Sequence, residues 1–165
     1  MVTAWKDDLD ADIAGEAIIN ASWAGTAVYG ALAIAGTIFP DTFAIPTAIV
    51  SGAWFVIGCI TFLWAYAVAV ARSRTDLIGI GGLYFLAGTA PKVVRFRLRL
   101  SLALEVVAAI LSSSIRPFTP MAFGFLVPVF GLGLSGLWGA RHGTFTRRDA
   151  PEPEADTDAK ADASE

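Results

Sequence analysis

Residues 98–117 read LRLSLALEVVAAILSSSIRP, an apolar run with one carboxylate, Glu105, near its middle. About 20 apolar residues are enough to cross the ~30 Å hydrocarbon core of a bilayer as a single helix. Arg99 lies near the start of this run, and Arg116 and Pro117 close it. The stretch therefore predicts a membrane-spanning helix with an ionisable side chain inside it.

Three other apolar runs predict three more spans, and the overall composition agrees with them. Of the 165 residues, 55% are hydrophobic and 16% are charged, with a mean hydropathy of +0.61. Soluble domains carry about a quarter charged residues. We predict an all-α, four-helix transmembrane bundle with spans at about residues 17–39, 46–71, 98–116 and 120–140.

Proline residues mark the ends of the predicted helices. Pro40 closes the first span, and Pro46 suits the first turn of the second, where a proline removes no helical hydrogen bond. The connections at residues 41–45 and 118–119 are then short, so the helices that they join are antiparallel. The run at residues 77–90 is too short to span as a helix, at about 21 Å. We predict an interfacial or re-entrant segment there, with a fifth span as the alternative.

The positive charges predict how the bundle lies in the membrane. Lys and Arg collect in short cytoplasmic loops. If both termini are cytoplasmic, only Arg116 of the 12 Lys and Arg residues lies outside. The inner set is Lys6, Arg72, Arg74, Lys92, Arg95, Arg97, Arg99, Arg141, Arg147, Arg148 and Lys160. We therefore expect both termini in the cytoplasm.

The two ends of the chain differ in composition from the membrane domain at residues 17–145. Residues 1–16 are acidic, and we expect a cytoplasmic segment that is either a short amphipathic helix or disordered. Residues 146–165 are rich in acid, Ala and Pro and have no hydrophobic pattern. Such a composition predicts a disordered cytoplasmic tail.

Glu105 belongs to a polar stripe along the third predicted span. Helical spacing places on one face Ser101, Glu105, Ala108 and Ser112. The opposite side carries Leu102, Val106 and Leu111. Glu105 lies six residues past Arg99, about 9 Å into the helix on the cytoplasmic side. An ionised side chain inside a bilayer costs about 2.5–3.5 kcal/mol, so we expect this carboxylate to face the other helices.

Two interpretations of Glu105 follow. It is structural if it bonds to a hydroxyl or amide on a neighbouring helix, for which the candidates are Asn20, Ser22, Ser51 and Thr61. It is functional if it relays a proton or a small cation. We favour the structural interpretation, because a relay needs several ionisable groups and no other lies deep within a predicted span.

Small residues four positions apart predict close helix packing. The fourth span carries one such ridge, Gly131, Ser135 and Gly139, and the first span carries another, Ala27, Ala31 and Ala35. We expect both ridges to pack inside the bundle, with a subunit interface as the alternative. Pro128 should kink the fourth span.

The segment PKVVRFRLRLS at residues 91–101 is basic. It contains Lys92, Arg95, Arg97 and Arg99, and the first, second and fourth of these share a helix face. Anionic lipid headgroups attract such clusters by about 1 kcal/mol per charge. We expect a topology anchor in contact with the bilayer and its anionic headgroups. We expect no nucleic-acid binding, because the patch is small and has a single aromatic residue, Phe96.

The sequence contains no set of residues that would form an enzyme or cofactor site. The serines at 112–114 have no nearby His or Lys to act as a base. The chain has one cysteine, Cys59, and one histidine, His142, which are too few to bind a transition metal. The glycine-rich stretches lack the GK[ST] of a phosphate loop. We expect a non-catalytic protein without cofactor or metal.

Residues 114–143, SIRPFTPMAFGFLVPVFGLGLSGLWGARHG, resemble the C-terminal part of small integral membrane proteins of actinobacteria. The resemblance implies a location in a bacterial cell membrane and brings no activity with it. The short loops outside the membrane, the small-residue ridges and the lack of a catalytic set favour an accessory or scaffolding subunit of a membrane complex, associating with other membrane subunits or with itself. The alternatives are a small oligomeric proton or cation transporter that uses Glu105, and a membrane-tethered regulator that acts through its cytoplasmic tails.

Overall fold

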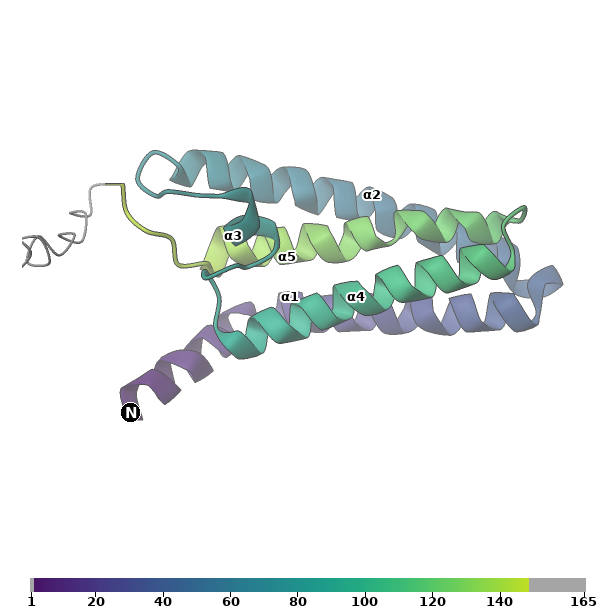
Figure 1. Ribbon diagram of the computed structural model, residues 1–165, viewed down its shortest axis with the longest axis horizontal. Coiled ribbons are helices and arrows are strands. Elements are labelled where there is room, and N and C mark those ends of the chain that lie inside the picture. The colour runs from purple at the N-terminus through teal and green to yellow at the C-terminus, as the bar shows by residue number, and fades with distance from the viewer. Residues whose placement is uncertain (1, 149–165) are drawn as a thin grey trace, which may run out of the picture.

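The computed structural model describes residues 2–148, with side chains described from Gly15 onward. Four long helical segments within that range lie side by side and alternate in direction (Figure 1). All four are long and apolar enough to cross a membrane. The predicted all-α, four-helix architecture is therefore confirmed. The predicted disordered tail falls outside the described residues except for 146–148.

The first two helices form a hairpin with almost no loop. Helix α1 covers Val2–Ile38 and helix α2 covers Pro40–Arg72, so Phe39 alone joins them. The acidic start of the chain is thus helical and continuous with the first span. Pro40 does end the first helix, as expected, but it also starts the second. Two predictions are wrong here, because residues 41–45 are helical and Pro46 lies inside α2.

The third span is helix α4, Lys92–Ile115. It starts six residues before the predicted boundary, so the basic segment forms its first two turns. The buried face of α4 includes Val94, Leu98, Ser101, Glu105, Ala109, Ser112 and Ser113. The predicted stripe is right at three of its four positions, since Ala108 is only half-buried and Ala109 takes the central place.

The fourth span is two helices end to end, where the sequence predicted one kinked helix. A 3-10 helix, η1, covers Pro120–Leu126, and helix α5 covers Pro128–His142. Pro128 has no N–H to give to the carbonyl of Gly124 four residues earlier. That carbonyl instead accepts from the N–H of Val127 at 3.1 Å, which is a 3-10 bond. The proline therefore ends one helix and starts another inside the span.

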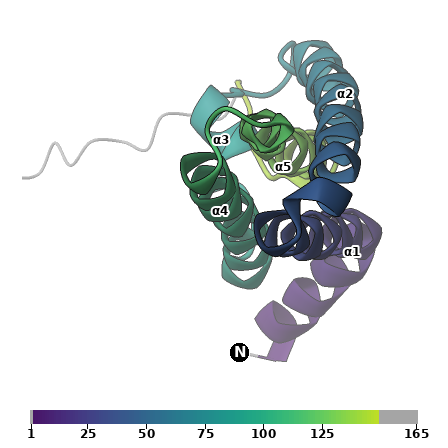
Figure 2. The same ribbon diagram turned by 90° about the vertical axis from the view of Figure 1, so that its right-hand side faces the viewer.

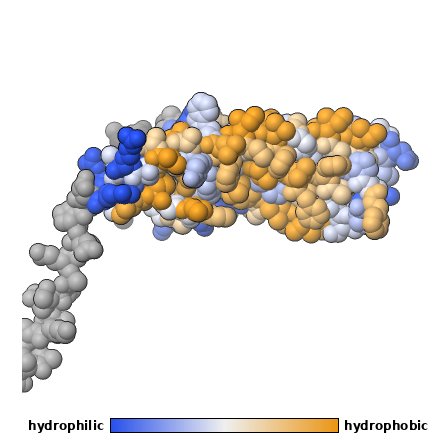
Figure 3. All heavy atoms as spheres, turned by 90° about the horizontal axis from the view of Figure 1, so that it is seen from above, coloured by the Kyte–Doolittle hydropathy of each residue, from blue (hydrophilic) through white to orange (hydrophobic). Residues whose placement is uncertain are grey.

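Helix α5 is the central element of the bundle. It contacts each of the other three long helices, and the end-on view places it between them (Figure 2). In an 18-residue apolar window of its span 56% of the residues are buried, against 17% in the corresponding window of α2, which presents most of its surface outward. Apolar residues cover the flank of the bundle, and hydrophilic groups gather at the end that holds the start of α4 (Figure 3). This distribution is consistent with a multi-pass membrane protein, as the four apolar helices suggest.

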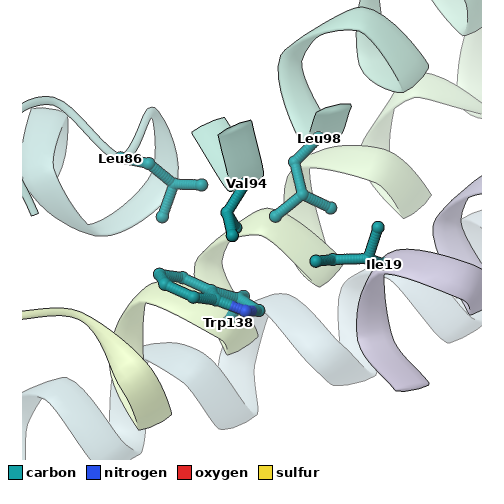
Figure 4. Packing of buried hydrophobic residues seen from close by; sticks show 5 residues of the cluster. All are labelled: Ile19, Leu86, Val94, Leu98 and Trp138. Atoms are coloured by element: carbon teal, nitrogen blue, oxygen red, sulfur yellow. The ribbon is translucent and has the colours of Figure 1, made fainter. Parts of the chain in front are cut away.

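Residues 77–90 fold back against this hydrophilic end. They contain a single short helix, α3, Ile80–Tyr84, whose five residues exclude a fifth span. Tyr84 donates a hydrogen bond to the Phe62 carbonyl at 3.2 Å, and burial raises the pKa of its phenol. Leu86 inserts into a buried cluster that joins α1, α4 and α5 (Figure 4). The other members of that cluster are Ile19, Val94, Leu98 and Trp138.

Arg72 fastens the same end of the bundle. Its guanidinium donates to the carbonyls of Ala140 at 2.8 Å and Gly143 at 3.2 Å, at the C-terminus of α5. It also pairs with Asp76 at 3.1 Å. A cation at this position satisfies carbonyls that lack partners within the helix. Beyond α5, the N–H of Leu77 donates to the carbonyl of Thr146, which keeps the chain against residues 75–77.

Candidate functional site

Glu105 lies at the meeting point of α1, α4 and α5. Its side chain has no exposed surface. One carboxyl oxygen, Oε1, accepts from the Thr26 hydroxyl at 2.8 Å, and the other, Oε2, accepts from the Gly131 N–H at 3.1 Å. The single ionisable side chain deep within α4 therefore bonds to both neighbouring helices.

The bond from Gly131 places the carboxyl at the start of α5. The first turn of a helix carries backbone N–H groups without partners inside the helix, and its end of the dipole is positive. Gly131 is the fourth residue of α5, and Pro128 is the first. Because the proline restarts the helix inside the span, those N–H groups lie away from water. Glu105 supplies an acceptor from another helix to one of them, the Gly131 N–H.

Gly131 is required at this contact for a steric reason. A Cβ on residue 131 would lie 2.5 Å from Oε2 of Glu105 and 3.2 Å from a methyl carbon of Leu102. Backbone and carboxyl can therefore approach to hydrogen-bonding distance only because the residue has no side chain.

A chain of hydroxyl groups extends from Glu105 along the α1–α4 contact. Thr26 Oγ1 lies 2.7 Å from Ser101 Oγ, which lies 2.8 Å from Ser22 Oγ. Thr26 also lies 2.9 Å from the Ser22 carbonyl. All three hydroxyl side chains are buried. Buried polar groups of this kind stabilise a fold when each has a partner.

The hydroxyl hydrogens can be arranged in two complete ways. With a charged carboxylate, Ser22 donates to Ser101, Ser101 to Thr26, and Thr26 to Glu105. With a protonated carboxyl, Glu105 donates to Thr26, and Thr26 donates to the Ser22 carbonyl. The Ser22 and Ser101 hydroxyls donate as before. The site is thus satisfied in either protonation state of Glu105.

The structure divides the predicted polar site into two groups. Ser101 joins Glu105 through Thr26, whereas Ser112 lies farther along α4 and pairs with Tyr29 at 3.3 Å. The sequence singled out neither Thr26, Tyr29 nor the Gly131 amide. The sequence pattern could have indicated Thr26 as a partner, because Ser22 and Thr26 have the same four-residue spacing as Ser101 and Glu105 on the facing helix.

Of the partners expected for Glu105, none bonds to it directly. Ser22 is linked to it through other hydroxyls. Asn20 is exposed, Ser51 donates to the Thr47 carbonyl, and Thr61 lies near carbonyls of its own helix.

The two small-residue ridges differ in burial. All three residues of the ridge on α5, Gly131, Ser135 and Gly139, are buried within the bundle. Gly139 lies directly against the Leu83 carbonyl, so it receives the returning segment 77–90. On α1 the prediction of internal packing is wrong, because Ala27 and Ala31 are exposed. The buried face of α1 contains Ser22, Gly25, Thr26, Tyr29, Ala33 and Gly36.

The basic residues at the start of α4 lie at the hydrophilic end of the bundle. Lys92 and Arg99 are exposed, and Arg95 and Arg97 are half-buried. Arg99 donates from Nε and Nη2 to the Phe85 carbonyl, at 2.9 Å and 2.6 Å.

No group of three or more His, Cys, Asp or Glu residues comes together among residues 15–148 in a way that could hold a metal ion. The His142 ring packs on the Trp138 ring, with centroids 5.6 Å apart. Comparison of the chain with models of protein families, with curated proteins and with solved structures gives no match.

Replacing Gly131 with alanine should destabilise the bundle. The new methyl group would separate Oε2 from the Gly131 N–H, and overpacking of this kind costs about 1–3 kcal/mol. Unfolding by a denaturing detergent, followed by circular dichroism, measures the change. Gly52→Ala is the matched control, because a Cβ at that helix position meets nothing within 4 Å. Equal stabilities of the two variants would contradict the proposed contact.

Glu105→Gln should remain close to the parent in stability, whereas Glu105→Leu should lose about 1–3 kcal/mol. The amide oxygen can accept from Gly131 while its NH2 donates to Thr26, as the protonated acid would. Leucine leaves the Gly131 N–H buried without an acceptor. The same unfolding assay compares the variants. A large loss in Glu105→Gln would show that the negative charge itself is needed.

Proposed function

We propose that this chain is a non-catalytic integral membrane protein that serves as an accessory or scaffolding subunit of a membrane complex. The observation that carries the proposal is the complete burial of Glu105, with both of its oxygens bonded to neighbouring helices. This deeply placed carboxyl group is thus engaged in holding three helices together. The outward-facing apolar surface of α2 supports the same role, since such a flank can face lipid or another subunit.

The proposal includes an orientation and a location. Both termini are cytoplasmic, and the membrane is that of a bacterial cell. The excess of Lys and Arg on one side supports the orientation. The resemblance of residues 114–143 to actinobacterial membrane proteins supports the location.

A proton or small-cation transporter is the second candidate, and one observation favours it. Polar side chains continue along the α1–α4 contact on both sides of Glu105, with hydroxyls toward the hydrophilic end and the Tyr29–Ser112 pair beyond it. We rank it second because none of these other groups is a carboxyl, His or Lys. Regulation through the cytoplasmic tails remains a third proposal.

Purification and flux measurements separate the first two candidates. Purified in a mild detergent from its native membrane, the tagged chain should elute in a stoichiometric assembly, and another small multi-span protein with the same tag should not yield that assembly. In reconstituted vesicles the parent should show no proton flux above empty vesicles. A monomer without companions would contradict the scaffolding role. Flux that Glu105→Gln abolishes would establish the transporter instead.

Cysteine labelling tests the orientation. With Cys59 changed to serine, a Phe118→Cys variant should react with a membrane-impermeant maleimide in intact cells, because Phe118 is fully exposed at the predicted outer end. A Thr75→Cys variant should react only after the cells are permeabilised. Thr75 is exposed at the opposite end, which makes it the matched control. The reverse labelling pattern would invert the proposed orientation.

A further inference from the structure

We propose that the face of the first two turns of α4 that points away from the bundle is a binding site for the headgroup of an anionic phospholipid. A groove of about 450 Å³ on this face is lined by Lys92, Arg95, Phe96, Arg99 and Leu100. Three of the five lining side chains are cations, and the other two are apolar. Such a lining is complementary to a phosphate group with an acyl chain attached to it.

The local charge is unbalanced in a way that an anion would correct. The first turn of α4 contains no acidic residue, although the N-terminus of a helix is the positive end of its dipole. Cations there are unfavourable unless an anion is near. Among the side chains described from Gly15 to Arg148, the one ion pair is Arg72 with Asp76, which leaves the cations of the groove unpaired within that range.

Arg99 is already held in place for such a ligand. Its Nε and Nη2 atoms both donate to the Phe85 carbonyl, so the guanidinium plane is fixed by the segment 77–90. A guanidinium has five N–H donors, so donors remain for a phosphate. A cation fixed before binding loses less conformational freedom when the ligand arrives.

The apolar lining favours a lipid over free phosphate. Phe96 is 66% exposed and Leu100 is 36% exposed. Both lie at the edge of the membrane-spanning part of α4, where they can contact an acyl chain. Farther along the helix, Leu104 and Val107 continue an exposed apolar surface. An acyl chain can follow that surface from the headgroup toward the middle of the bilayer. Inorganic phosphate has no apolar part that would bind there.

Arg97 does not belong to this site. It lies on the same two turns of α4, but it does not line the groove, and it is half-buried on another side of the helix. The basic segment thus has a ligand-facing set and one cation outside that set. Only the choice of leaflet, the cytoplasmic one, depends on the orientation proposed above.

Native mass spectrometry of the full chain in mild detergent tests the site. The parent is titrated with phosphatidylglycerol and, separately, with phosphatidylcholine. We expect at least a tenfold preference for phosphatidylglycerol at the first bound lipid. Each cation should contribute about fivefold, so Lys92→Gln/Arg95→Gln should lower that affinity roughly 25-fold. The double variant leaves Arg99 and its bonds to Phe85 unchanged, and an unaltered melting temperature confirms that it folds.

Arg97→Gln is the matched control, because it removes one charge from the same turns without touching the groove. It should lower phosphatidylglycerol affinity less than threefold. A loss equal to about half that of the double variant on a logarithmic scale would show diffuse attraction and overturn the site. So would the absence of a lipid preference in the parent. Displacement of the bound lipid by inorganic phosphate at the same concentration would assign the groove to free phosphate. Detergent removes sidedness, so these results stand apart from the labelling of Phe118→Cys.

Discussion

The hydrogen bond between Glu105 and the first turn of α5 joins two groups that are each unfavourable alone in a bilayer. A carboxyl group loses its water there, and a helix that begins inside the membrane exposes N–H groups to hydrocarbon. Each supplies what the other lacks, at 3.1 Å. The interruption at Pro128 and the acidic residue in the neighbouring span are therefore parts of one arrangement, and either would be costly without the other.

The surroundings of this bond meet its requirements from three directions. On α5, Gly131 lacks the side chain that would block the approach. On α1, Thr26 donates a hydrogen bond to the second carboxyl oxygen and links it to Ser22 and Ser101. At the hydrophilic end, Arg72 and the returning segment 77–90 hold the opposite end of α5. The central helix is consequently tied at both ends by side chains from other elements, one of which is Arg72 at the end of α2.

The spans could be predicted because a bilayer imposes a length and a composition on every crossing, and Pro40 marks a true helix end. Pro46 and Pro128 show where that reasoning fails. The first is accommodated inside a helix and the second replaces an α-helical bond by a 3-10 bond. Which outcome occurs depends on tertiary neighbours. The partner of Glu105 was missed for a related reason, because a backbone amide leaves no trace in the sequence and helix rotation decides which hydroxyl faces it.

The order of synthesis gives the hydroxyl chain a role before the bundle is complete. Helices α1 and α4 precede α5 in the chain, so Glu105 emerges from the ribosome ahead of Gly131, its backbone donor. During that interval Thr26 and Ser101 are the polar groups that can shelter the carboxyl. When α5 follows, its first turn meets an acceptor that is already oriented. The α1–α4 contact thus offers the last helix a polar group to dock on before the bundle is complete.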